Sequence, residues 1–84
     1  MRRRPRPDEV LARVHEAVGD GFCVVGDLEA AFRGSGRREL HRAIRRALNQ
    51  GWLIERRDQR RRQVVAIAPE GWRVLRETEA QRAG

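Results

Sequence analysis

The chain has 84 residues, a length that corresponds to one domain with a modest hydrophobic core. Its 19 basic residues, all of them Arg, outnumber 12 acidic residues and give a formal net charge of +7. A catalytic cleft with its supporting residues is hard to fit into such a chain, whereas a compact binding module for a negatively charged partner fits easily.

The first seven residues contain only Arg and Pro after the Met, and we expect a disordered basic arm ahead of a folded domain at 8–82. Asp8 is a candidate N-cap for the first helix. The apolar residues that follow recur at helical spacing and predict one buried stripe, formed by Val10, Leu11, Val14, Ala17 and Val18. The glycines at 19 and 21 then end this helix.

The segment 22–25 is short, apolar and rich in β-forming residues, so it predicts a strand. Within it, Cys23 is expected to be a small buried hydrophobe, and as the only Cys it has no internal disulfide partner. A second, short helix is predicted at 27–32, followed by a tight turn at 33–36. The inward side chains of that helix are expected to be Leu28, Ala31 and Phe32.

A third helix is predicted from about Arg37 to about Gln50, because apolar residues again recur at helical spacing before Gly51. Its inward face contains Leu40, Ile44, Ala47 and Leu48. At 100° per residue, the opposite face contains Arg38, Arg42, Arg45 and Asn49, flanked by His41 and Arg46. Such a helix can pack on a core while its basic side enters a major groove.

The C-terminal part predicts two strands, at 52–56 and 63–67, joined by a polar hairpin tip. The tip contains no Gly, so its turn type stays open. Pro69 suits the start of a final helix at 70–81, with Trp72 and Leu75 facing inward.

This order of elements is that of a winged helix-turn-helix. We therefore expect a mostly helical α+β fold with a three-helix core, a small antiparallel sheet that forms the wing, and a C-terminal helix.

Three stretches, 51–56, 58–62 and 68–75, carry a resemblance to the wing region of MarR-like and PadR-like transcriptional regulators. Asp58, Arg60 and Arg62 match their Asp-x-Arg-x-Arg spacing, and Pro69 and Gly71 match the Pro-x-Gly that opens the next helix, although Ala68 stands where Thr is usual. The resemblance covers about 22–75 and implies a DNA-binding fold whose wing reaches an adjacent minor groove. Those regulators are longer, so it implies nothing about a ligand.

The charge is unevenly distributed along the chain. Residues 33–62 have a net charge of +8 and the first seven +4, while the remaining residues have a net charge of −5. A generic soluble surface mixes the two signs, so this asymmetry predicts a face that binds a polyanion. An ordinary solvated helix face is the alternative explanation of this charge, and a coding preference is the alternative explanation for the use of Arg without Lys.

We expect double-stranded DNA to be the partner. Arg38 and Arg42, near the start of the third helix, are assigned to base edges, and Arg45, Arg46 and Asn49 to phosphates. Ser35 is a turn or cap residue that can also hold a phosphate. The complete predicted contact set is Ser35, Arg37, Arg38, His41, Arg42, Arg45, Arg46, Asn49, Arg57, Arg60, Arg61 and Arg62. The N-terminal arm is either a further DNA contact or a solubilising tail.

Three functions remain open at this point: a transcriptional regulator, a chromosome- or ribosome-associated nucleic-acid-binding protein, and a protein-interaction module. The chain has no Tyr or Lys, no carboxylate pair with metal-site spacing and no clustered His or Cys, so we expect no enzyme activity, cofactor or metal. Trp52 and Trp72 are expected in the core or in a dimer contact. The first and last helices are the candidate homodimer surfaces. Without a long apolar stretch, a cytoplasmic, nucleoid-associated prokaryotic protein is expected.

Overall fold

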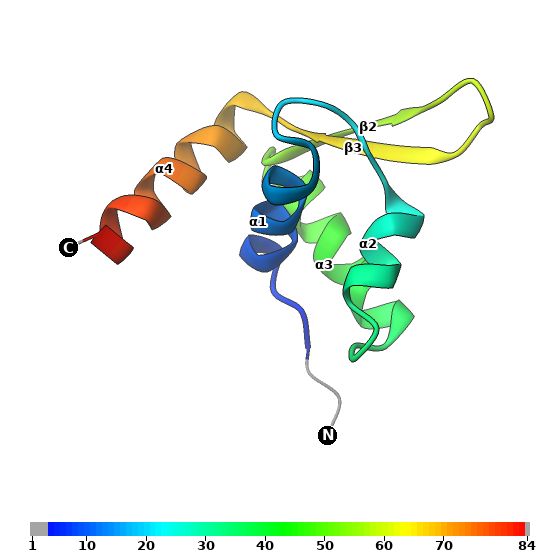
Figure 1. Cartoon of the computed structure of the whole chain (residues 1–84), viewed down its shortest axis with the longest axis horizontal. Helices are drawn as coiled ribbons and strands as arrows, with labels where there is room; N and C mark the ends of the chain where they lie inside the picture. The colour runs from blue at the N-terminus through cyan, green and yellow to red at the C-terminus, as the bar shows by residue number, and fades with distance from the viewer. Residues whose placement is uncertain (1–3, 84) are drawn as a thin grey trace.

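The computed structural model describes residues 4–83, with side chains up to position 81. It has an α+β fold with four helices and a small three-stranded antiparallel sheet. The elements are α1 (Pro7–Val18), β1 (Cys23–Val24), α2 (Val25–Ala31), α3 (Arg37–Asn49), β2 (Leu53–Arg57), β3 (Gln63–Ile67) and α4 (Pro69–Ala83). Figure 1 shows α1, α2 and α3 grouped beneath the sheet, while α4 extends away on the side opposite the tip of the β2–β3 hairpin.

The first helix begins at Pro7, so the expectation that Asp8 caps it is wrong. Proline is favoured at the first helical position because its fixed φ suits the helix and its missing N–H is not needed there. The carboxylate of Glu9 accepts the backbone N–H of Arg6 at 3.3 Å, which stabilises this start. Pro5 is buried, so the expectation of an arm without packing is wrong at this residue. Residues 1–3 of that arm lie outside the described part of the chain.

The second helix begins at Val25, two residues earlier than its apolar pattern predicts. As a result β1 shortens to Cys23 and Val24, and Val25 joins Leu28 as a buried residue of α2. Ala31, expected inward, is exposed, and so is Ala17 at the end of the α1 stripe. Small Ala side chains contribute little apolar area, so they do not fix which face of a helix turns inward.

The central strand of the sheet is β3, in the order β1-β3-β2. Cys23 pairs with Val65 on one side of β3, and Leu53 pairs with Ile67 on the other. Every residue of β3 after Gln63 is buried, and Cys23 is buried as expected. The core also includes Val10, Leu11, Val14, Leu28, Leu40, Ala43, Ile44, Ala47 and Leu75, and no polar or charged residue is buried between positions 4 and 81.

The hairpin tip closes through a turn in which the backbone N–H of Arg61 donates to the carbonyl of Asp58 at 2.9 Å. Arg61 itself has φ 62°, in the left-handed region that Gly or Asn usually occupies at this position of a three-residue hairpin loop. The tip therefore adopts a standard loop geometry although its sequence has no Gly. The backbone N–H of Asp58 completes it by donating to the carbonyl of Arg62 at 3.0 Å.

The last helix packs on the sheet end through its first turns. Trp72 contacts His15 of α1 edge-on, with ring centroids 5.2 Å apart and planes at 86°. Both Trp52 and Trp72 are half-buried against the core, which was one of the two expected placements, the other being a dimer contact. None of the helices described between residues 4 and 83 has the length and apolar character that a bilayer span requires.

Candidate nucleic-acid interface

The third helix has one buried side and one basic side, as its spacing predicts. Leu40, Ala43, Ile44 and Ala47 are buried. The opposite side is exposed and forms what we call the basic face of α3, defined by Arg38, Arg42, Arg45, Arg46 and Asn49. Because the apolar stripe fixes the rotation of the helix, these five side chains must point away from the core.

The guanidinium groups of this face are not neutralised by the rest of the described chain. Between residues 4 and 81, Arg38, Arg42, Arg45 and Arg46 form no ion pair with a carboxylate. Elsewhere ion pairs are common, as between Arg13 and Glu16 at 3.4 Å in α1 and between Arg73 and Glu77 at 2.6 Å in α4. The basic face therefore presents positive charge and hydrogen-bond donors to an external partner.

The start of α3 is tied to α2 through Glu29. One carboxylate oxygen of Glu29 lies 3.0 Å from Nε2 of His41, and the other lies 3.6 Å from Nε of Arg37. These two members of the predicted contact set thus hold α2 and α3 together at the turn. Ser35 lies in that turn, where its N–H donates to the carbonyl of Phe32 at 3.0 Å. The N-cap of α3 is Gly36, so of the two roles expected for Ser35 the structure shows the turn residue and not the cap.

The hairpin tip presents a second group of exposed arginines, Arg57, Arg60, Arg61 and Arg62. Asp58 organises it, because its Oδ1 accepts the backbone N–H groups of Arg60 at 2.9 Å and Arg62 at 2.8 Å. The Asp58 Oδ2 accepts a further bond from Nε of Arg62 at 2.7 Å. Desolvation alone would raise the pKa of Asp58, but these bonds together hold that pKa below its ordinary value.

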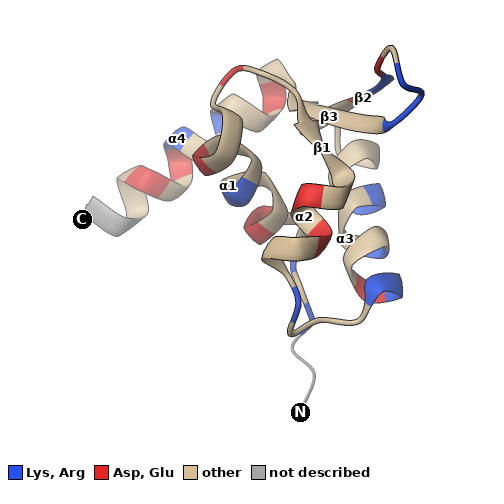
Figure 2. Cartoon of the chain, turned by 45° about the vertical axis from the view of Figure 1, so that its right-hand side comes forward, with Lys and Arg blue, Asp and Glu red and all other residues tan. Residues whose placement is uncertain are grey.

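The basic face of α3 and the hairpin adjoin one another across a shallow groove. His41, Arg45 and Asn49 line it from α3, and Glu55 and Gln63 line it from the base of the hairpin. Nε2 of Gln63 donates to Glu55 at 2.5 Å across the two strands. Figure 2 shows the basic residues of α3 and of the hairpin tip on one side of the molecule, whereas α2 carries acidic residues and α1 and α4 carry residues of both signs.

Two features of this surface were not part of the predicted contact set. Arg56 on β2 is exposed and has no carboxylate partner among the described residues, so it extends the basic surface of the hairpin. Arg4 and Pro5 lie beside α3, where they line a hollow with Arg42 and Arg46. The buried Pro5 follows from tertiary packing, for which a segment of Arg and Pro gives no local signal.

Comparison of the chain with protein-family models, with curated proteins and with solved structures gave no match. The functional interpretation therefore depends on the exposed, unpaired arginines and on their placement. Cys23 offers no alternative chemistry, because burial, assisted by nearby Asp27 and opposed by Arg13, raises the pKa of its thiol.

Proposed function

We propose that this chain is a winged helix-turn-helix protein that binds double-stranded DNA and acts as a small transcriptional regulator on the prokaryotic chromosome, in the cytoplasm. The observation that carries the proposal is the set of unpaired guanidinium groups shared by α3 and the adjoining hairpin. Phosphates attract such groups strongly, and Arg in addition recognises guanine edges with two parallel hydrogen bonds.

The order of the elements supports this function. In the proposed complex α2, the turn at 32–36 and α3 act as the helix-turn-helix, and the β2–β3 hairpin acts as the wing. An α-helix of 13 residues is about 20 Å long and fits the major groove, which is about 12 Å wide. Glu29 supports the helix pair by holding the start of α3 against α2.

The proposed roles follow from position along α3. Arg38 and Arg42, in its first half, contact base edges, since recognition helices use their N-terminal residues for this purpose. Arg45, Arg46 and Asn49 contact phosphates on the groove walls. The arginines of the hairpin tip contact the adjacent backbone or minor groove, where narrow A·T-rich segments favour Arg.

A homodimer is the proposed form on DNA, because specific sites commonly contain two half-sites about one helical turn apart. The first and last helices offer the surface for it. A groove between α1 and α4 is lined in part by Leu11, Val74 and Leu75, with Phe32 at its end. Two copies joined there would present two basic faces of α3 to the same duplex.

Selection of bound duplexes from a random pool tests the proposal. The wild-type chain is expected to enrich a defined sequence arranged as two half-sites. The double variant Arg38→Ala/Arg42→Ala is expected to lose that enrichment. The control is Arg76→Ala, which removes an exposed Arg of α4 that does not line the groove between α1 and α4 and is expected to keep that enrichment.

The other outcomes distinguish the remaining functions. Strong binding with equal affinity for selected and random duplex indicates a chromosome-coating protein. Stronger binding of RNA duplex than of DNA indicates a ribosome-associated protein. Absence of duplex binding even at low salt contradicts the proposal and leaves a protein-interaction module.

A further inference from the structure

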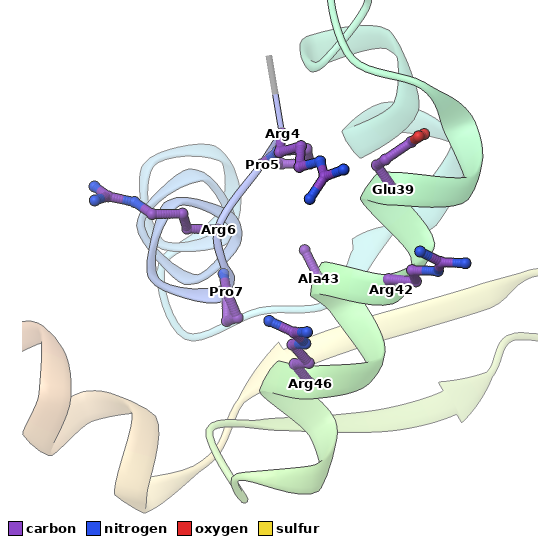
Figure 3. Close-up of a pocket in the computed structure, with 8 residues that line it drawn as sticks. All are labelled: Arg4, Pro5, Arg6, Pro7, Glu39, Arg42, Ala43 and Arg46. Atoms are coloured by element: carbon purple, nitrogen blue, oxygen red, sulfur yellow. The ribbon is translucent and has the colours of Figure 1, made fainter. Parts of the chain in front are cut away.

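A small hollow lies between the segment before α1 and the side of α3 (Figure 3). It has a volume of about 170 Å³, and its lining residues are Arg4, Pro5, Arg6, Pro7, Glu39, Arg42, Ala43 and Arg46. A water molecule occupies about 30 Å³ in the liquid, so the hollow has room for a tetrahedral oxyanion together with some of its water.

The hollow exists because Pro5 is buried beside α3. The small side chain of Ala43 leaves space at its floor, and Pro7 fixes the direction in which the segment joins α1. Arg4 is exposed, and it lies beside the hollow because the next residue, Pro5, is buried there. Pro5 has a restricted φ, and it also restricts the backbone conformation of Arg4, the residue before it. Both restrictions limit where Arg4 can lie.

Two unpaired positive charges face the hollow. In Figure 3 the guanidinium groups of Arg4 and Arg46 lie on either side of Ala43 and extend into the hollow. Neither group forms an ion pair within the described chain, and the guanidinium of Arg42 extends away from the hollow. Arg6 points outward and pairs with Asp8 at 3.4 Å, and the carboxylate of Glu39 points away from the floor.

We propose that Arg4 and Arg46 form a binding site for a phosphate group. Two guanidinium groups across a small hollow repel each other. An anion between them attracts both groups, and this attraction outweighs their repulsion. Each guanidinium can donate two parallel hydrogen bonds to phosphate oxygens. Because one of the two groups comes from the N-terminal segment, the bound anion also fixes that segment on α3.

The phosphate has two possible sources: the backbone of a DNA duplex, or a free phosphate or phosphate monoester. The first source rests on the proposed function, since it adds a backbone contact next to the basic face of α3. The second does not depend on DNA binding. A test at Arg4 separates them, because Arg4 lies outside the predicted DNA contact set and is exposed, so its loss leaves the core intact.

The experiment follows amide NMR signals of the full chain during titration with inorganic phosphate, against sodium chloride of equal ionic strength. In parallel, the affinity for a selected duplex is measured. Both are done for wild type, Arg4→Ala, Arg4→Lys and the control Arg76→Ala, which removes an exposed unpaired Arg of α4. The unperturbed amide spectrum of each variant verifies its fold.

Saturable phosphate-dependent shifts of the amides of Arg4, Arg6 and residues 42–46, lost in Arg4→Ala and kept in Arg76→Ala, support a site for free phosphate. A loss of duplex affinity of about fivefold to tenfold in Arg4→Ala alone supports a site for the DNA backbone. Arg4→Lys is expected to restore only part of either signal, because it keeps the charge but loses the fork. If Arg4→Ala changes neither signal, the site is overturned. If wild type binds phosphate through Arg4 but no duplex, the proposed function fails and the site stands.

Discussion

Gly71 lies in the first turn of α4, directly against the backbone of Trp52. A Cβ atom added at Gly71 would overlap the carbonyl oxygen of Trp52 and come within 2.9 Å of Cγ2 of Ile67. That carbonyl is not free to move, because it accepts the N–H of Ala68 at 2.9 Å. The close approach of α4 to the end of the sheet therefore requires glycine at this position.

We predict that Gly71→Ala lowers the free energy of unfolding by about 1–3 kcal/mol, the usual effect of overpacking a filled site. Urea denaturation of the full chain measures it. Gly34→Ala is the control, since an added Cβ there meets nothing within 4 Å. Its effect is expected within about 0.5 kcal/mol. Equal stability of the two variants would contradict the packing described for α4.

Asp58 makes the hairpin tip dependent on pH. Its pKa is lowered in the folded chain by the bonds from Arg62 and Arg60 that outweigh desolvation, so these bonds stabilise the fold above the ordinary Asp pKa of about 3.9. The stabilisation is lost as the pH falls through the lower, folded value. NMR titration of the Asp58 carboxyl is expected to show its pKa rising in Arg62→Ala. Arg60→Ala, which keeps the backbone donor of residue 60, is expected to leave it nearly unchanged.

The structural roles of some residues could be predicted from the sequence, and those of others could not. The Pro-x-Gly at 69–71 is a recognisable signal, and the structure supplies its physical reason in the Trp52 carbonyl. Spacing also predicted which arginines of α3 are exposed. It could not predict the bond between His41 and Glu29, because that bond depends on how α2 crosses α3.

At the scale of the elements, α3 and the hairpin are expected to make separable contributions to DNA binding. Arg42→Ala on α3 is predicted to weaken binding and relax the preferred sequence at one base position, a loss of about 1–3 kcal/mol of discrimination. Arg60→Ala on the hairpin tip is predicted to weaken binding to all sequences about equally. Competition assays against single-base variants of the selected site measure both. Retention of both affinity and preference in Arg42→Ala would show that α3 is not the recognition helix.

The elements were more predictable than their ends. The strand at 63–67 has the predicted bounds, and α3 differs from its prediction by about one residue at its C-terminal end. The strand predicted at 52–56 lies one residue later, and the helix predicted at 70–81 begins at Pro69 and extends to Ala83. At Pro7 and Val25 a helix begins earlier than its strongest local signal. At Val25 a β-branched residue starts a helix because its side chain fills the core beside Leu28, and tertiary packing outweighs local propensity.

At the scale of the whole molecule, the basic residues are concentrated on α3 and the hairpin. The arginines of α3 and the hairpin lie on one side, and Asp or Glu residues of α1, α2 and α4 lie elsewhere (Figure 2). This separation orients the molecule as it approaches a polyanion and raises the association rate at low salt. In the proposed complex it also disfavours contact with DNA through α1, α2 and α4.

We predict a steep dependence of duplex affinity on salt. If five to eight phosphates are neutralised, the slope of log affinity against log salt is about −4 to −7. Fluorescence anisotropy with a labelled duplex over a series of salt concentrations measures this slope. A flat dependence would rule out contact through the arginines of α3 and the hairpin.

The α+β class and the order of elements could be read from the sequence, because each element has its own periodicity and end signals. The placement of residues 4–7 against α3 could not be read. It depends on a contact between Pro5 and a helix that begins some thirty residues later, and nothing in the local pattern of Arg and Pro encodes that distance.

The central position of β3 has a consequence for the synthesis of the chain. A growing polypeptide that has reached Arg62 already contains all the arginines of α3 and the hairpin tip, yet it lacks Val65 and Ile67, around which β1 and β2 pair. No strand of the sheet has its partner until those residues emerge, so the helices have no finished layer to pack against. A fragment that ends before β3 is therefore expected to be highly charged and to lack the sheet, and completion of the fold waits for residues 63–67.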